Sequence, residues 1–204
     1  MGGKTQARTQ TSMGASTSAR EDPDGDLISR MAAGEPRALR LLMDRHLTRV
    51  HAIAYRMLGN VADAEDVSQE AFLKAWRQAG KWQSGRARFS TWLIRVAMNG
   101  ATDRLRKKPF TDLADIEEPV DPGRRPDQSL EDSELRERVS IALGQLPDRQ
   151  RAALVLNHYE GYGNPEIAEV MEVSVEAVES LLARARRALK SALAGEIALL
   201  KGDH

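Results

Sequence analysis

Apolar residues recur every three or four positions through most of this chain, and that spacing restricts it to helical folds. In residues 39–58, 63–80, 89–108 and 130–193 the pattern makes one face of a 3.6-residue helix apolar. No stretch shows convincing alternation of apolar and polar residues. Aromatic residues make up only 4% of the sequence, which also favours helices over sheet sandwiches. We therefore expect an all-α protein.

The helical segments fall into two groups with a proline-rich segment between them. Residues 109–129 hold four of the eight prolines and many acids, and proline disfavours helix at its own position and at the one before. We expect a flexible acidic linker there, joining two small helical domains at 25–108 and 130–195. Residues 1–24 are rich in Gly, Ser, Thr and Gln and are expected to be disordered. Residues 196–204 form a C-terminal tail that either extends the last helix or frays.

Capping residues predict where individual helices begin and end. Asp63 is expected to cap a helix that stops at Gly80, and Ser174 is expected to cap the final helix. Asn164 followed by Pro165 is typical of an N-cap and the first helical residue. Other boundaries are expected at Gly59, Pro147 and Gly161.

Several function classes lack the residues that they need. Cysteine is absent, which excludes disulfides, thiolate metal sites and a cysteine nucleophile and fits a reducing cytoplasm. No apolar run approaches the roughly 18 residues that span a bilayer, so we expect no membrane insertion. His46 and His51 are five residues apart and share a helix face poorly, and no glycine-rich phosphate loop is present. We expect no cofactor, no metal and no enzymatic activity.

The charges cancel overall but are unevenly distributed. Residues 24–108 carry 16 basic and 9 acidic side chains, residues 109–129 carry 2 and 6, and residues 130–204 carry 9 and 13. Ten of the basic residues lie in 74–108, against the single acid Asp103. A local field of that sign attracts polyanions. The other interpretation is a solvated helix face.

Residues 164–189 predict two short helices with a tight turn, the spacing of a helix-turn-helix. In DNA-binding examples the second helix lies in the major groove, and arginines can hold phosphate. A plain helical hairpin with a basic end remains the alternative. The outward positions of the second helix would be Glu176, Ser180, Ala183, Arg184 and Arg187.

Two longer motifs resemble bacterial sigma factors. The run AEDVSQEAFLKAW followed by FSTWLIRVAMN resembles region two, and LPDRQRAALVLNHYE with the hairpin after it resembles region four. The resemblance covers roughly residues 25–108 and 130–193, and the linker is too short for a third sigma domain. The chain resembles a small sigma factor of the extracytoplasmic-function group of the sigma-70 family. It is therefore expected to have a region two helical bundle and a region four helix-turn-helix.

The resemblance implies a docking site for core RNA polymerase on the first domain. The matching positions would contact the clamp helices of the largest polymerase subunit. The flap of the second-largest subunit is a further expected partner. Their spacing places acids, an amide and one apolar residue on a single helix face, although a solvated face would look the same. These positions are Asp66, Gln69, Glu70 and Leu73.

The resemblance also implies two promoter contacts. The first domain would bind the minus-ten element as a single strand through a stacking indole, an amide and surrounding cations, namely Trp82, Arg88, Arg95, Asn99, Arg104, Arg106, Lys107 and Lys108. The second domain would bind the minus-thirty-five duplex through Glu176, Glu179, Ser180, Ala183, Arg184 and Arg187. Many relatives have basic residues where Glu179 and Leu181 stand, so we expect weak duplex binding by this domain alone.

The resulting expectation is a cytoplasmic sigma factor that binds core polymerase and promoter DNA and directs promoter-specific initiation. The resemblance further implies control by an anti-sigma factor and a stress regulon. The main alternative is a two-domain helix-turn-helix regulator acting without core polymerase. The sequence leaves open whether the two domains pack together.

Overall fold

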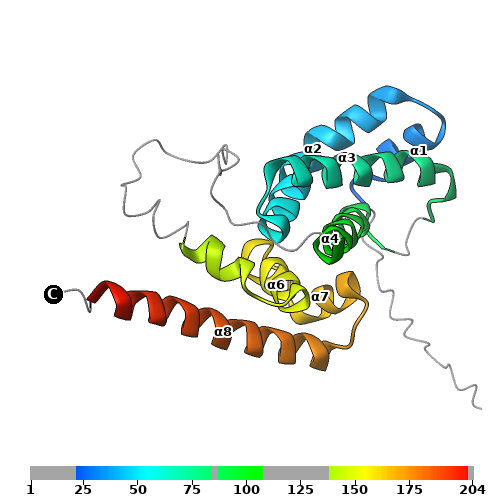
Figure 1. Ribbon diagram of the computed structural model, residues 1–204. Coiled ribbons are helices and arrows are strands. Elements are labelled where there is room, and N and C mark those ends of the chain that lie inside the picture. Colours follow the sequence, from blue (N-terminus) through cyan, green and yellow to red (C-terminus); the bar gives the residue numbers. More distant parts are fainter. Residues whose placement is uncertain (1–21, 84–86, 108–137, 202–204) are drawn as a thin grey trace, which may run out of the picture.

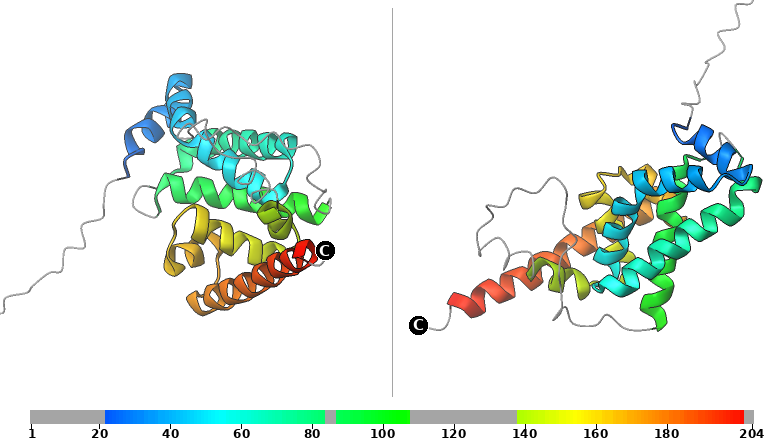
Figure 2. Two further views of the ribbon diagram at one scale, coloured as in Figure 1. Left: turned by 90° about the vertical axis from the view of Figure 1, so that its left-hand side faces the viewer. Right: turned by 90° about the horizontal axis from the view of Figure 1, so that it is seen from above.

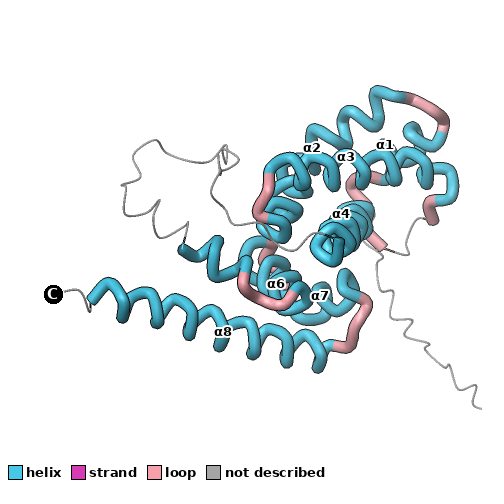
Figure 3. Tube along the Cα trace, in the orientation of Figure 1, coloured by secondary structure: helices cyan, strands magenta, loops and turns pink. Residues whose placement is uncertain are grey.

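The structure, a computed structural model, describes residues 22–83, 87–107 and 138–201, with side chains described as far as 194. All regular elements in these ranges are helical, which confirms the predicted all-α class (Figures 1 and 3). The expected linker at 109–129 and most of the expected N-terminal tail lie outside the described residues.

The first group of helices forms a compact bundle around one apolar core. It contains α1 (Gly25–Ala32), α2 (Pro36–Leu58), α3 (Val61–Gln78), a 3-10 turn η1 (Ala79–Lys81) and α4 (Phe89–Lys107). Helices α2, α3 and α4 all pack against one another. Their apolar faces supply fully buried side chains such as Leu42, Ile53, Val67 and Leu93.

The joint between α2 and α3 differs by a few residues from the prediction. Gly59 ends α2 in the left-handed conformation with φ of 68°, and its N–H donates to the Tyr55 carbonyl over 2.7 Å. The cap of α3 is Asn60, whose side-chain oxygen accepts from the Asp63 N–H at 2.9 Å. The predicted cap Asp63 is therefore wrong. It lies in the first turn, where its charge still favours the helix N-terminus.

The second group consists of a helical segment at 138–144, α6 (Asp148–Leu154), a π turn η2 (Val155–Tyr159), α7 (Asn164–Met171) and α8 (Val175–Lys201). Gly163, not Asn164, is the cap of α7, and the Glu166 carboxylate accepts from its N–H at 2.9 Å. Ser174 caps α8 as predicted, accepting from the Ala177 N–H at 3.2 Å. Because α8 continues through Lys201, it includes most of the segment predicted as a tail from 196.

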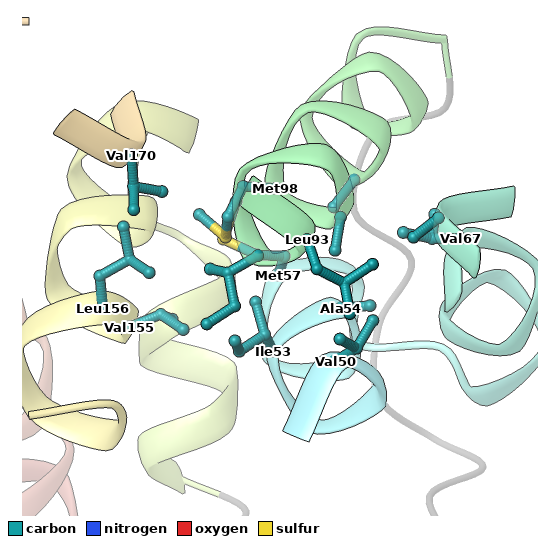
Figure 4. Packing of buried hydrophobic residues seen from close by; sticks show 14 of the residues in the cluster. Val50, Ile53, Ala54, Met57, Val67, Leu93, Met98, Val155, Leu156 and Val170 are labelled. Carbon is teal, nitrogen blue, oxygen red and sulfur yellow. The ribbon is translucent and has the colours of Figure 1, made fainter. Parts of the chain in front are cut away.

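The two groups pack together, a point that the sequence left open. Figure 1 and the left view of Figure 2 show α1–α4 as one layer and α6–α8 as the other. Met57 and Met98 from the first group lie against Leu156 and Val170 from the second (Figure 4). The buried core is therefore continuous across the two groups.

One buried arginine ties the groups together through backbone carbonyls. Arg151 is 2% exposed, and its guanidinium donates to the carbonyls of Leu143, Gly144 and Leu146, which lie at or just after the end of the helical segment at 138–144. It also donates to the Met57 carbonyl at the end of α2, over 2.5 Å. Burial lowers the pKa of Arg151, but arginine remains charged in proteins.

Candidate polymerase and nucleic-acid interfaces

The predicted docking residues form an exposed stripe on α3. Asp66, Gln69, Glu70 and Leu73 are all exposed, whereas Val67 and Ala71 on the opposite face are buried. Leu73 leaves 51% of its surface in solvent, the largest exposed fraction among the exposed large apolar side chains of the described residues. The structure thus places all four predicted residues on one face, with an apolar anchor beside acids.

Arg104 belongs to this acidic stripe. Its guanidinium lies 3.0 Å from Asp63, 3.3 Å from Asp66 and 3.2 Å from Glu70. From the sequence, Arg104 was grouped with the cations around the minus-ten face. The structure shows that its side chain crosses from α4 to the acids of α3. It offsets repulsion between Asp66 and Glu70, which are like charges one turn apart.

Three aromatic rings form a cluster where the loop after η1 meets the start of α4. The Trp82 ring centroid lies 5.7 Å from Phe89 and 5.7 Å from Trp92, both in edge-on geometry. Phe89 is buried, while Trp82 and Trp92 are half-buried. Such packing fixes the Trp82 ring and leaves part of it exposed. Packing against Phe89 and Trp92 is therefore compatible with the predicted stacking role of Trp82.

An acidic residue far upstream in the sequence caps the N-terminus of α4 next to the aromatic cluster, and the sequence did not predict it. The Asp22 carboxylate accepts from the Phe89 N–H at 2.6 Å, at the N-terminus of α4. Nearby, the buried Asp24 pairs with Arg45 at 2.9 Å and with His46 at 2.7 Å. Residues 22–24, expected within the disordered tail, are therefore part of the packed first domain. A capping contact across 67 positions leaves no local sequence signal.

The remaining minus-ten candidates lie along α4 with different surroundings. Asn99, Arg106 and Lys107 are exposed, and so is Arg88, just before α4. Arg106 pairs with Asp103. Arg95 is only 24% exposed, and its guanidinium lies 3.1 Å from Glu172 at the end of α7. Lys108 lies outside the described residues.

The six predicted minus-thirty-five positions lie along α8: Glu176, Glu179, Ser180, Ala183, Arg184 and Arg187. All six are exposed. The pKa of Glu176 is lowered because its own backbone N–H, and then the Ser174 hydroxyl, donate to the carboxylate. Its oxygens are thus engaged as part of the helix cap. Arg186, in contrast, turns back to the Asn157 side-chain oxygen at 2.9 Å.

Within ranges 22–83, 87–107 and 138–201, no group of three or more His, Cys, Asp or Glu side chains is arranged to hold a metal ion. In the same ranges, the helices are too short or too polar to cross a bilayer.

Two family models match the chain. The model described as Sigma-70 region 2 covers residues 42–110, and that described as Sigma-70, region 4 covers residues 136–189. The first match includes the docking stripe and the aromatic cluster. The second includes the helix-turn-helix.

The chain is also similar to named proteins over most of its length. The RNA polymerase sigma-H factor of Pseudomonas aeruginosa is 33% identical over 187 residues, which cover 85% of this chain and 95% of that protein. The ECF RNA polymerase sigma factor SigW of Bacillus subtilis is 32% identical over 177 residues, covering 81% and 94%.

Solved structures show a similar arrangement. CnrH, in complex with the cytosolic domain of CnrY, matches with a TM-score of 0.62 and 29% identity, covering 89% of this chain and 99% of that one. The sigma factor RpoE of Bartonella quintana, in complex with the anti-sigma factor NepR, shares the fold with a TM-score of 0.58 at 22% identity, covering 81% and 98%. Together, the motifs, the two matched regions and these relatives show that the chain belongs to the extracytoplasmic-function sigma factors of the sigma-70 family.

Proposed function

We propose that this chain binds core RNA polymerase and directs it to specific promoters in the cytoplasm. The observation that carries the proposal is the pair of separate faces on the first domain. One face is the acidic stripe of α3 with exposed Leu73, and the other is the α4 face, where exposed Asn99 lies on the same helix as Trp92 of the aromatic cluster. A protein contact and a single-strand contact can therefore be made at the same time.

The polymerase contact would use Asp66, Gln69, Glu70 and Leu73. A leucine that is half exposed is removed from water when a partner covers it, and the acids around it attract a basic partner surface. Arg104 holds two of these carboxylates toward α4, which limits the rotamer freedom lost on docking. The clamp helices of the largest subunit are the proposed partner, with the flap of the second-largest subunit for the second domain.

The minus-ten contact would use the α4 face. A base leaving the duplex loses a few kcal/mol of stacking and pairing, which a half-exposed indole and an exposed amide can offset. Trp82 would supply the stacking surface and Asn99 the hydrogen bonds to a base edge. The surrounding cations Arg88, Arg95, Arg106, Lys107 and Lys108 would follow the sugar-phosphate backbone.

The minus-thirty-five contact would use the exposed face of α8. Ser180 and Ala183 are small enough to allow close approach to a groove, while Arg184 and Arg187 would pair with phosphates. Of the two acids, Glu179 is the better candidate to accept from a cytosine N4 amine, because the Glu176 carboxylate is engaged in the cap of α8.

Regulation by an anti-sigma factor, releasing the protein under stress, belongs to the same proposal. It is supported by the Bartonella quintana relative, which was solved with such a partner. The chain would then initiate transcription of a stress regulon only after release.

Reconstituted transcription tests the proposal. Core polymerase with and without the full chain would be incubated with fragmented genomic DNA, and transcript ends would be mapped. We expect new start sites that share two upstream motifs. Tight duplex binding by the chain alone, with no added start site, would instead favour a regulator that acts without core polymerase.

A matched pair of variants tests the docking face in the same system. Asp66→Lys with Glu70→Lys should weaken core binding at least tenfold, since two attractive contacts become repulsive. Glu35→Lys with Asp26→Lys makes the same charge change at exposed acids next to α1 and α2 and should leave core binding near wild type. Equal affinities for the two double variants would exclude the docking assignment.

A further inference from the structure

The residue at the N-cap position of α4 cannot cap the helix with its own side chain. The Arg88 carbonyl accepts the first bond of the helix, from the Trp92 N–H at 3.0 Å, so Arg88 is the N-cap residue. Good N-cap side chains accept from the free N–H groups of the first turn, but a guanidinium has only donors. The Asp22 carboxylate takes this role from outside the helix, accepting from the Phe89 N–H at 2.6 Å. Its negative charge also favours the helix N-terminus.

Residues 22–24 form a strap that holds this carboxylate in place. The second oxygen of Asp22 accepts from the Asp24 N–H at 3.0 Å. Asp24 is 3% exposed, and its carboxylate lies 2.9 Å from Arg45 and 2.7 Å from His46, both on α2. Arg45 also donates to the carbonyl between the two aspartates at 3.4 Å. The strap therefore fastens the start of α4 to α2 through polar contacts that are partly shielded from water.

The anchor of the strap on α2 also contacts the aromatic cluster. The His46 ring centroid lies 5.8 Å from that of Phe89. The Phe89 ring in turn lies 5.7 Å from Trp82 and 6.0 Å from Trp92. Phe89 is thus held at its backbone N–H by Asp22 and at its ring by three other rings. Because both indoles pack on Phe89, a shift of this residue would change the orientation of both.

The strap lies away from the polymerase docking stripe. Its contacts are at the start of α4 and on α2, whereas the stripe is on α3 and pairs with Arg104. Arg104 lies roughly 22 Å further along α4 than Phe89. The strap is also outside the residues matched by the Sigma-70 region 2 model, which begin at 42. A change in the strap should therefore alter the aromatic cluster and leave the stripe in place.

We propose that the strap is a positioning element for the minus-ten strand: Asp22 sets the start of α4, and Asp24 holds Asp22 on α2, so that Trp82 keeps its exposed surface toward a base. This inference rests on the proposed single-strand function of the α4 face. Asp22 acts through Phe89 and makes no contact with the strand. A ring that is fixed beforehand loses less side-chain freedom when a base stacks on it.

The charge of Asp22 and its positioning role predict opposite effects on DNA binding. Asp22→Ala removes a negative charge near a DNA face, and that loss alone would tighten binding of the phosphate backbone. If Asp22 positions the cluster, the same change loosens the first turn of α4 and weakens binding. We expect the affinity of holoenzyme for a single strand carrying the minus-ten motif of a mapped start site to fall roughly three- to tenfold. Unchanged or tighter binding would overturn the proposal.

Two matched variants isolate the cap. Asp26→Ala makes the same charge change on α1, at an exposed side chain 3.6 Å from Arg30, and should keep strand affinity within about twofold of wild type. Asp22→Asn retains one oxygen that can accept from the Phe89 N–H, and asparagine is a good N-cap residue. It should recover part of the affinity that Asp22→Ala loses. Equal losses for Asp22→Asn and Asp22→Ala would overturn the capping role.

Core binding distinguishes positioning from general stability. Asp22→Ala should bind core polymerase as wild type does, because the α3 stripe is unchanged. Its holoenzyme should nevertheless open the mapped start sites several-fold more slowly, in line with the weaker strand binding. A loss of core binding as large as the loss of strand binding would mean that the strap only stabilises the fold.

A double-variant cycle tests whether Asp22 and the anchor on α2 act as one unit. Arg45→Gln removes one partner of Asp24, and Arg40→Gln removes the same charge from an exposed position of the same helix. Combined with Asp22→Ala, Arg45→Gln should lower strand affinity by less than the product of the two single effects, since contacts in one network are not additive. With Arg40→Gln the effects should multiply. Multiplied effects in both pairs would exclude the anchoring role of Asp24.

Tryptophan emission separates failure of this inference from failure of the proposed function. Acrylamide quenching of the three tryptophans should rise in Asp22→Ala and not in Asp26→Ala, and equal quenching in the two variants would overturn the positioning. If Asp22→Ala opens the mapped start sites as fast as wild type, the inference is wrong and the function stands. If wild type opens no start site, yet quenching rises in Asp22→Ala alone, the strap positions the cluster and the assigned DNA function is wrong.

Discussion

The two proposed DNA faces, on α4 and on α8, differ in chemistry and in accessibility. The α4 face combines an indole cluster with an exposed amide, and one of its arginines is held by acids of the second domain. The α8 face has no aromatic residue among its predicted contacts, and all six of them are exposed. Stacking groups suit an unpaired strand, whereas small and charged side chains on an exposed helix suit a duplex groove.

From this difference we infer that DNA binding is regulated at the α4 face and not at the α8 face. The packed chain still presents α8 to DNA, but α8 starts with acids and lies in a domain with more acidic than basic residues. Because phosphate neutralisation dominates affinity, we expect the exposed face to bind weakly. The more basic α4 face is the one that is partly covered. We therefore expect the free chain to have little affinity for DNA through either face.

The largest predicted effect concerns Arg151, which joins the layers that carry the two faces. Arg151→Met should lower the free energy of unfolding by about 3 kcal/mol, since four carbonyls lose a charged donor in a buried site. Urea denaturation followed by circular dichroism measures this loss. Arg149→Met, on the same helix but not buried, should change stability by less than about 0.5 kcal/mol. Similar losses of unfolding free energy for the two variants would mean that the buried hydrogen bonds of Arg151 contribute no more to stability than an exposed arginine does.

Asn99→Ala should produce the next largest effect, confined to the α4 face. Loss of one good amide contact to a base costs about 1 to 3 kcal/mol, so initiation from the chain's own promoters should fall about tenfold or more. Core binding and thermal stability should remain at wild-type values because Asn99 is exposed. Run-off transcription and a core-binding titration measure the two quantities. An equal loss of core binding would indicate a folding role instead.

Local patterns in the sequence predicted the helices and their faces but not the contacts between domains. Periodicity places Leu93 and Ala97 on one side of α4 and Asn99 on the other, because neighbours three and four apart share a face. The Arg49–Glu160 pair joins residues 111 positions apart, and the Arg151–Met57 bond spans 94. Charged residues at such separations look the same in the sequence whether they face water or a second domain. The ion pairs of Arg104 could not be predicted for a related reason, because its partners lie on a different helix.

Replacing two arginines of α8 tests whether this helix binds duplex DNA while α4 binds the single strand. Arg184→Gln with Arg187→Gln should lower duplex affinity several-fold and reduce the salt dependence by about one unit for each phosphate that is no longer neutralised. Binding of single-stranded DNA by the holoenzyme should be unchanged, since α4 is untouched. Fluorescence anisotropy at several salt concentrations measures both. A loss of equal size on both substrates would contradict the division of labour between α4 and α8.

The smallest predicted effect distinguishes repulsion from base reading at Glu179. Glu179→Gln removes one negative charge from the α8 face and should tighten non-specific duplex binding about twofold, since like-charge repulsion at an exposed site is weak. If the carboxylate also accepts from a cytosine N4 amine, preference at one promoter position should fall in the same variant. Glu176→Gln should leave that preference intact, because the Glu176 carboxylate is engaged by its own N–H and by Ser174. Selection from a randomised minus-thirty-five library with each holoenzyme measures the preference. Loss of preference with Glu176→Gln, and none with Glu179→Gln, would assign the base contact to Glu176 instead.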